Sequence, residues 1–417
     1  MVSIDPTGVI DVAGSKLFPL GISNPPPLGG LTSDGKDAFQ ELASNGVNFL
    51  RLGRQLWSPV DATLRMQVKQ VTDVMDVAHP LGMLGWFWLG NTPNYAVAAN
   101  KTLLPKLVAA VKSHPGLGAW KGIDEPNNPE EAPSARTPAK GMIDAYNAVK
   151  AIDPGHPLVV THEPISPASA LMGYRAACDI TGADIYPVSY PPGTHAQTAN
   201  HDISVVGDIT SKLKQVAGPK PVWMTLQIAW SGITPSPGKP NTPRFPTLLE
   251  ERFMAYQAIV HGARGLFFFG GNITQVMRPL DARTGWNWTF WNLVLKPLLA
   301  ELTSTAVQPA LLAPESAAKI KAGVPDVDVG TRQTGQFLYV IAVRCGASTS
   351  LVQFSGLPKR HDGQPIGGGE VLFEYEQVPP TSPPDPTKQA FRPIGVSGGS
   401  FHDWLGPHDT HVYRFQL

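Results

Sequence analysis

The sequence predicts a (β/α)₈ barrel followed by a small antiparallel β-domain. Three observations lead to this fold class. Strand-like and helix-like runs alternate eight times between residues 16 and 304. The strand-like runs are apolar on both faces, as in parallel strands that helices cover. The alternation stops near residue 314, where short runs with period-two patterning begin. We therefore expect a (β/α)₈ barrel over 1–313 and a β-sandwich-like domain over 314–417.

The barrel elements follow one another with regular punctuation. A hairpin-like segment, GVIDVAGSKLFPLG, leads into the first strand, within 16–27, which three consecutive prolines stop. The other strands are expected at 47–53, 83–91, 118–126, 157–164, 181–187, 219–227 and 264–272. The helices, several of which end at a glycine as helices commonly do, are expected at 37–46, 63–82, 102–116, 141–155, 170–180, 204–218, 247–263 and 291–304.

An open doubly wound sheet is the alternative to a closed barrel. Its first strand-to-helix turn would carry the G-x-G-x-x-G pattern that cradles a pyrophosphate, and GISNPPPLGG lacks this pattern. The sequence therefore favours the barrel and argues against nucleotide binding.

The C-terminal part consists of short alternating runs separated by Gly, Pro and Asp. They are AAKIKAG, DVDVG, QFLYVIAVRC, STSLVQFSG, EVLFEYE and THVYRFQL. This pattern is typical of a small antiparallel β-domain. The segment 378–391 is too rich in proline for a helix or a central strand and is expected to be an exposed loop.

Composition limits the classes of partner. The chain has 417 residues, and Lys+Arg and Asp+Glu balance at 33 each. No global field favours nucleic acid or an anionic membrane, so a neutral molecule is the expected partner. No run reaches the length of a membrane span, and MVSIDPTGVI lacks the features of a signal peptide. Both a cytoplasmic protein and a secreted or periplasmic one that has lost its signal peptide fit this start. The oligomeric state stays open.

Two cysteines, Cys178 and Cys345, fall in different expected domains, so we expect free thiols. The 11 histidines are scattered without H-x-H or H-E-x-x-H, which argues against a metal. A serine hydrolase would need G-x-S-x-G, and GVSGG at 395–399 does not supply it. No cofactor is expected.

Polar residues at the ends of the expected strands are the candidate site, because barrel enzymes build their sites there. They are Arg51, Trp88, Asn91, Asp124, Glu125, His162, Glu163, Asp184, Tyr186, Gln227 and Trp230. Pro126 biases Glu125 toward the last extended position of its strand. Arg51 interrupts an apolar strand and needs a carboxylate partner, for which Glu125 is the expected choice.

These residues resemble the retaining (β/α)₈ glycoside hydrolases of the clan that includes cellulases, β-mannanases and β-galactosidases. The resemblance covers about residues 16–305. Arg51, Glu125-Pro126 and Tyr186 match the clan pattern, which makes Glu125 the expected acid/base. Asp124 replaces an Asn, and Asp184 replaces a sixth-strand His. Gln227 stands where the clan has its nucleophilic Glu, and a neutral amide cannot form a glycosyl ester.

Three hypotheses account for Gln227. In the first, Glu125 is the acid, and Asp184, or secondly Glu163, acts as base or nucleophile. In the second, Gln227 replaces a native Glu and leaves a sugar-binding barrel with little hydrolysis. In the third, the pair is placed differently and uses both Asp124 and Glu125. A non-catalytic carbohydrate-binding barrel is therefore the alternative to a glycosidase for an oligo- or polysaccharide.

Aromatic residues near strand ends support a sugar ligand, because pyranose faces stack on indole rings. The candidates are Trp57, Trp86, Trp88, Trp230, Trp286 and Trp288, of which Trp88, Trp230 and the last two lie beside loops. The long Pro/Gly/Ser-rich segment 231–247 is expected to shape the cleft, with Arg244 contacting the ligand.

Overall fold

The structure is a computed structural model that describes residues 2–130, 132, 135–190, 198–228, 242–273, 277–375 and 391–417. The described residues form two compact units, Met1–Leu248 with Gly262–Ala300, and Leu249–His261 with Glu301–Leu417. Compactness thus groups 301–313 with the C-terminal strands. The expected boundary between residues 313 and 314 stays a prediction.

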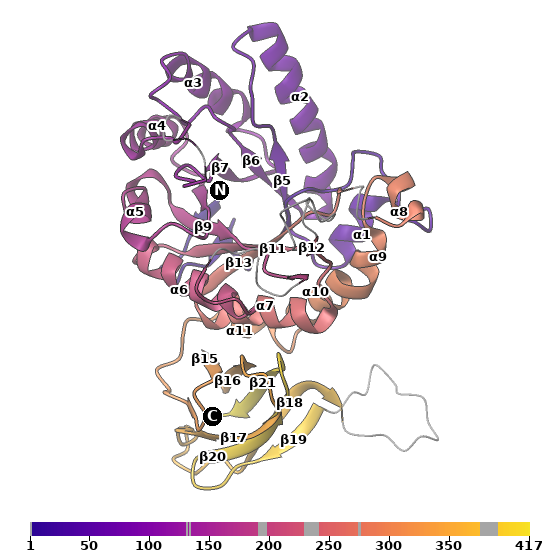
Figure 1. Cartoon of the computed structure of the whole chain (residues 1–417), viewed down its shortest axis with the longest axis vertical. Coiled ribbons are helices and arrows are strands. Elements are labelled where there is room, and N and C mark those ends of the chain that lie inside the picture. Colours follow the sequence, from indigo (N-terminus) through magenta and orange to yellow (C-terminus); the bar gives the residue numbers. More distant parts are fainter. Residues whose placement is uncertain are drawn as a thin grey trace. The chain divides into compact units, whose positions relative to one another are not determined.

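Eight parallel strands close into a barrel, as predicted (Figure 1). Its neighbours run in the order β11-β13-β4-β5-β6-β7-β8-β9. Most of these strands are buried along nearly their whole length, which explains their continuous apolar runs. Their bounds are β4 Leu20–Ile22, β5 Phe49–Gly53, β6 Leu84–Trp88, β7 Leu117–Asp124, β8 Leu158–His162, β9 Ile180–Asp184, β11 Val222–Gln227 and β13 Ala263–Phe269.

Helices alternate with these strands along the chain, and Figure 1 shows α2 to α6 around the ring of strands. The side chain of Asp37 caps α1 by accepting a hydrogen bond from the Gln40 amide at 2.8 Å. The helices are α1 Ala38–Ser44, α2 Asp61–Ala78, α3 Asn100–Val111, α4 Ala139–Ile152, α5 Ala168–Met172, α6 Val205–Ala217, α7 Leu248–Val260, α8 Pro279–Thr284, α9 Trp288–Phe290, α10 Lys296–Leu302 and α11 Gln308–Leu312.

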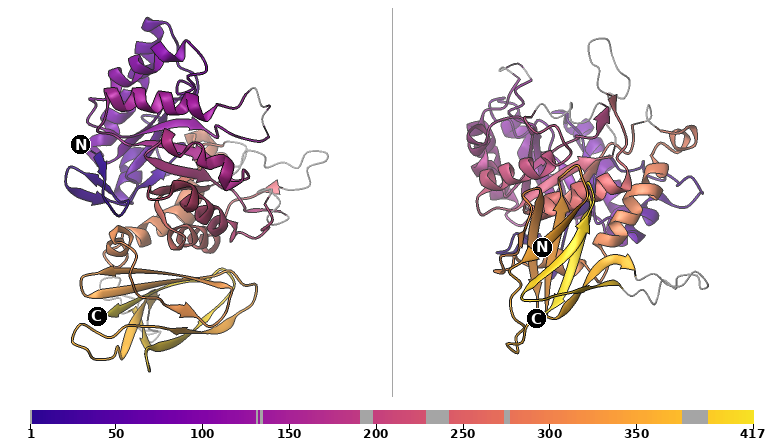
Figure 2. Two further views of the ribbon diagram at one scale, coloured as in Figure 1. Left: turned by 90° about the vertical axis from the view of Figure 1, so that its left-hand side faces the viewer. Right: turned by 60° about the horizontal axis from the view of Figure 1, so that its bottom comes forward.

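A small N-terminal sheet closes one end of the barrel. It consists of β1 Val2–Ile4, β2 Ile10–Val12 and β3 Ser15–Leu17, the hairpin-like segment of the sequence. Figure 2 shows it in indigo at the end of the barrel. Val2 and Ile10 belong to the same buried cluster as the barrel residues Phe49, Trp86 and Trp223. The apolar core therefore fills this end, and the polar site must lie at the other.

The second unit is a β-sandwich. A three-stranded sheet, β14-β17-β20, and a five-stranded sheet, β15-β16-β21-β18-β19, share one core. Phe354 and Phe401 come from the first sheet and Val340 and Phe415 from the second. The strands are β14 Lys321–Ala322, β15 Val327–Thr334, β16 Phe337–Arg344, β17 Ser350–Ser355, β18 Gly368–Tyr375, β19 Phe391–Gly395, β20 Ser400–Leu405 and β21 Thr410–Gln416.

Two of these strands, β19 and β20, were not predicted. Most of the proline-rich segment predicted as a loop lies outside the described residues, and its last residue, Phe391, begins β19. Cys178 and Cys345 are free thiols, as expected, although Cys345 is only partly buried. Among the described residues, no helix combines the length and the apolar character that crossing a membrane requires.

Candidate active site

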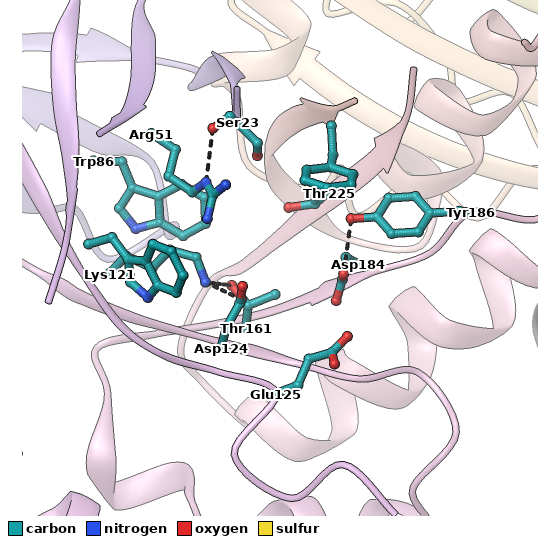
Figure 3. A pocket seen from close by; sticks show the side chains of 12 residues that line it. Ser23, Arg51, Trp86, Lys121, Asp124, Glu125, Thr161, Asp184, Tyr186 and Thr225 are labelled. Carbon is teal, nitrogen blue, oxygen red and sulfur yellow. Dashed lines mark hydrogen bonds and ion pairs between the residues drawn. The ribbon is translucent and has the colours of Figure 1, made fainter. Parts of the chain in front are cut away.

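A cavity of about 270 Å³ lies where the barrel strands end, and all eight strands or the residues just after them contribute to it (Figure 3). Its lining combines carboxyl groups, two cations and aromatic rings. The residues are Ser23, Arg51, Trp86, Trp88, Lys121, Asp124, Glu125, Thr161, Asp184, Tyr186, Thr225 and Phe269. This is the end of a barrel at which catalytic groups are found.

The end of β7 brings three charged side chains into this cavity. Lys121 and Asp124 are three residues apart, so a regular strand would point them to opposite faces. The pairing of β7 with β8 is irregular between these two residues, which lets both reach the cavity. Asp124 is the last residue of the strand. Glu125 has φ 46°, in the left-handed region, so the prediction that it is the last extended residue is wrong.

Lys121 forms the ion pair of the cavity with Asp124 and also donates to Thr161 Oγ1 at 3.2 Å. Its side chain is 3% exposed, whereas that of Asp124 is 41% exposed. Burial lowers the pKa of Lys121 below its usual value, although Asp124 opposes this effect. Burial acts to raise the pKa of Asp124, but the charges of Lys121 and Arg51 outweigh it, so this pKa is lowered. Asp124 is therefore an ionised carboxylate.

Glu125 and Asp184 form a second pair of carboxyl groups, and Figure 3 shows them pointing toward each other. Burial raises the pKa of Glu125, with a further increase from Asp124; a hydrogen bond from Asn128 at 2.9 Å opposes it. Burial also raises the pKa of Asp184 well above its usual value, and the charges of Glu125 and Asp124 add to this. Such a pair holds one proton more tightly than either acid alone.

The two oxygens of the Asp184 carboxyl group have different surroundings. Tyr186 donates its hydroxyl hydrogen to Asp184 Oδ2 at 2.9 Å, while Asp184 Oδ1 is buried without a hydrogen-bond partner among the described residues. An unpartnered buried oxygen is expensive for a carboxylate and less so for a carboxylic acid. The ring of Tyr186 stacks on Phe269 with centroids 5.3 Å apart.

Arg51 does not pair with Glu125, contrary to the sequence-based expectation. Its Nε donates to the Ser23 carbonyl at 2.9 Å, and its Nη2 donates to Asn24 Oδ1 at 2.6 Å. Its guanidinium carbon also lies 4.9 Å from the centroid of the Trp88 ring. Neutral acceptors and an aromatic face stabilise this charge, and the carboxylates of the cavity are bound by other groups. The carboxylate partner inferred from the apolar strand is therefore wrong.

Trp88 forms the wall beneath Arg51, and the neighbouring strand makes room for it. Gly53, opposite Trp88 in the pairing of β5 with β6, has φ 118°. A Cβ atom at this position would lie 2.7 Å from the Trp88 carbonyl oxygen. Only glycine fits both conditions. Trp86, one pleat deeper, lines the same wall.

Three other predicted site residues do not line the cavity. His162 is 1% exposed, and burial lowers its pKa to about 4, so it is a neutral core residue at the end of β8. Glu163 is also buried, and its Oε2 accepts hydrogen bonds from the Ile165 and Ser166 amides, which organises a turn. Asn91 lies exposed after β6, and its backbone oxygen accepts from Asn100.

The predicted ligand-binding tryptophans and arginine of the later loops do not line the cavity either, where the structure describes them. Trp286 and Trp288 are each 1% exposed, and both pack against Trp291 in the core. Arg244 does not line the cavity. Trp230 lies outside the described residues.

Gln227 is fully buried at the end of β11 and is not among the residues lining the cavity. Its Oε1 accepts from the Val188 amide at 2.8 Å. Its Nε2 donates to the carbonyl oxygens of Val188 at 3.0 Å and Arg244 at 3.1 Å. Both ends of the amide therefore hold neighbouring backbone, which is a structural role.

We expect Gln227→Glu to destabilise the protein rather than to create a nucleophile. A carboxylate would face two carbonyl oxygens that now accept hydrogen bonds, at a cost of about 3 kcal/mol in unfolding free energy at neutral pH. Burial would raise the pKa of the introduced carboxyl, so the loss should shrink as the pH falls toward about 4, where this group is protonated and can donate. Urea unfolding at several pH values measures this. A gain of hydrolysis with unchanged stability would contradict it.

Lining residues that the sequence analysis did not single out include Lys121, Ser23, Thr161, Thr225 and Phe269. Lys121 could have been identified from the sequence, because it lies inside the apolar run GAWKGID. A buried lysine needs a partner for its charge, as Arg51 does in its own strand. The small hydroxyl residues had no such signal, since serine and threonine are common at strand ends. Within the described ranges, no group of three or more His, Cys, Asp and Glu side chains is arranged to hold a metal ion.

Comparison with known proteins finds similar structures, but neither a protein-family model nor a curated protein matches the sequence. A family 5 glycoside hydrolase from Bacteroides vulgatus is similar in structure, with 13% identity, 100% of this chain and 93% of that chain covered, and a TM-score of 0.63. A family 30 endoxylanase from Clostridium papyrosolvens has 12% identity, 97% coverage of both chains and a TM-score of 0.53.

An α-amylase from Geobacillus thermoleovorans is also similar, with 9% identity, coverage of 96% of this chain and 98% of that chain, and a TM-score of 0.58. Identities this low establish likeness of fold. The chain has the fold of (β/α)₈ glycoside hydrolases.

Proposed function

We propose that the chain is a glycoside hydrolase that cleaves glycosidic bonds of an oligo- or polysaccharide, with Glu125 as general acid and base and Asp184 as the second carboxyl group. The observation that carries this proposal is the pair itself. Two carboxyl groups, one at the end of β9 and one just after β7, face each other in one cavity, and burial and neighbouring negative charges raise both pKa values. Glycosidases use such a pair, with one member protonated and the other ionised.

The shared proton can reside on either member, and the reactive arrangement has it on Glu125. Glu125 is partly exposed, so it can give the proton to the glycosidic oxygen. As the bond to the sugar carbon C1 breaks, ionised Asp184 acts on C1, directly or through a water molecule. The hydroxyl of Tyr186 supports the charge on Asp184. Trp88 and Tyr186 supply aromatic faces against which a pyranose ring can pack.

The wild-type chain should release new reducing ends from at least one member of a panel of plant and bacterial polysaccharides and 4-nitrophenyl glycosides. The Glu125→Gln, Asp184→Asn double variant is the control for contaminating activity, and it should release none above background. A wild-type chain that binds a glycan of the panel without cleaving it would contradict the hydrolase proposal.

A non-catalytic carbohydrate-binding barrel is the second candidate. The observation in its favour is Gln227, which stands where the glycosidases that the sequence resembles have a nucleophilic Glu. The cavity would then hold a sugar through the same aromatic faces. Binding without reducing-end release, in the assay above, is the result that this candidate predicts.

A further inference from the structure

Arg51 is the cation of the cavity that forms no ion pair with a described carboxylate, although its charge helps to lower the pKa of Asp124. None of the ion pairs found among the described residues includes it, whereas Lys121 is paired with Asp124. Its Nε and Nη2 are bonded to the Ser23 carbonyl and to Asn24, and both acceptors are neutral. Nη1 makes no hydrogen bond with any described residue. One amino group of a lining guanidinium is therefore available to a ligand.

The charges of the cavity are separated in space. Figure 3 places Arg51 on one side and Glu125 on the other, with Lys121 and Asp124 between them. The central pair is neutral as a unit, and Glu125 with Asp184 carries one negative charge when it holds one proton. The side of Arg51 is therefore locally positive, although the chain as a whole is balanced at 33 charges of each sign.

A ligand that fills this cavity expels water from Arg51. A neutral sugar would replace the solvent around the free amino group without supplying a counter-charge, which is costly for a guanidinium. An anionic group in the same place would restore the lost interaction with a charge-assisted hydrogen bond. On the side of Arg51, an acidic ligand would therefore be favoured over a neutral one.

We propose that the sugar unit held in this cavity is a uronic acid, whose carboxylate accepts a hydrogen bond from Arg51 Nη1. The inference rests on the proposed function and names its substrate class. The cavity of about 270 Å³ is near the lower end of ligand-pocket volumes, which suits a single small ring with a compact substituent. One free amino group has two N–H donors, which the two oxygens of a carboxylate are sufficient to accept.

The opposite side of the cavity fixes the orientation of this unit. A uronate bound the other way round would place its carboxylate against Glu125 and Asp184, and like charges repel. The acidic group therefore points to Arg51, and the glycosidic bond is left at the carboxyl pair. Attraction by Arg51 and repulsion by Glu125 and Asp184 therefore favour the same orientation of the uronate.

Calorimetric titration of the Glu125→Gln chain tests the inference without turnover. The ligands are glucuronate and galacturonate, their methyl esters, glucose, galactose and glucose 6-sulfate. At least one free uronate should bind about 10- to 100-fold more tightly than its methyl ester. Added salt should weaken binding of the free acid and not of the ester. Arg51→Gln should abolish the preference, whereas Arg65→Gln, which removes an exposed charge from α2, should keep it.

Equal affinity for the uronates and their esters would overturn the inference, as would tighter binding of glucose 6-sulfate. The comparison of free uronates with their methyl esters tests the inference even if Arg51→Gln does not fold, because the Glu125→Gln chain retains Arg51. The two proposals also fail separately. Hydrolysis of neutral glycosides without a uronate preference contradicts only this inference, and tight uronate binding without hydrolysis by the wild-type chain contradicts only the proposed function.

Discussion

Glu125→Gln is expected to lower kcat about 10²- to 10⁴-fold for glycosides with poor leaving groups, because the glycosidic oxygen then leaves without a proton. A 2,4-dinitrophenyl glycoside needs no protonation, so its cleavage should be much less affected. Asp184→Asn should slow both substrates, because the second carboxyl acts on C1 whatever the leaving group. Steady-state kinetics with 4-nitrophenyl and 2,4-dinitrophenyl glycosides of the same sugar measure the contrast.

The pH profile gives a second readout of the same assignment. An acid must be protonated to act, so kcat should fall as the pH rises through the pKa of Glu125, which burial and Asp124 raise. This alkaline limb should disappear in Glu125→Gln when both chains are measured with the same 4-nitrophenyl substrate. Glu130→Gln makes the same chemical change on an exposed residue of the same loop and should alter neither the rate nor the profile. Equal losses with both leaving groups would assign Glu125 another role.

Asp124→Ala is expected to lower the unfolding free energy by about 3 kcal/mol, because it leaves the buried Lys121 ammonium without its counter-charge. The value is toward the lower end for buried pairs, since the Asp124 side chain is 41% exposed and water screens part of the interaction. Adding Lys121→Met should restore most of the loss, because a well-packed apolar side chain can replace a buried ion pair. Urea unfolding of the single and double variants measures both effects.

The pH dependence of this destabilisation has a definite sign. Without Asp124, the pKa of Lys121 is lowered further in the folded state, so the unfolded state binds more protons. Stability then rises with pH, and the gap to the wild type should narrow toward pH of about 10. Asp73→Ala breaks an exposed ion pair with Lys69 and should cost much less. Equal losses in the two variants would show that Lys121 does not need Asp124.

Local sequence patterns were sufficient for the architecture. All eight barrel strands lie within or close to their predicted ranges, because continuous apolar runs between helical segments are characteristic of covered parallel strands. In the second unit, β19 and β20 were missed. β19 has few buried side chains, and in β20 the buried Phe401 and Leu405 alternate with exposed residues, as in sheet strands with one solvated face.

The candidate site was predictable only to the level of the strand. Position at a strand end selected six residues that line one cavity, namely Arg51, Trp88, Asp124, Glu125, Asp184 and Tyr186. The same rule also selected His162, Glu163 and Gln227, which end or follow strands but turn into the core or bind backbone. Distance along the chain does not reveal which way a side chain points once the strand becomes irregular.

The sequence by itself determined the barrel, the β-sandwich and the strand ends from which a site could be built, because these depend on periodicity and on where apolar runs stop. The tertiary structure alone decided which charges are neighbours. Lys121 forms an ion pair with Asp124, whereas the predicted pair of Arg51 with Glu125 does not form. An irregularity in the pairing of β7 and the left-handed backbone of Glu125 bring the side chains of Lys121, Asp124 and Glu125 into one cavity. Ion pairs act over a few ångströms, and the folded backbone sets such distances even between residues of one strand.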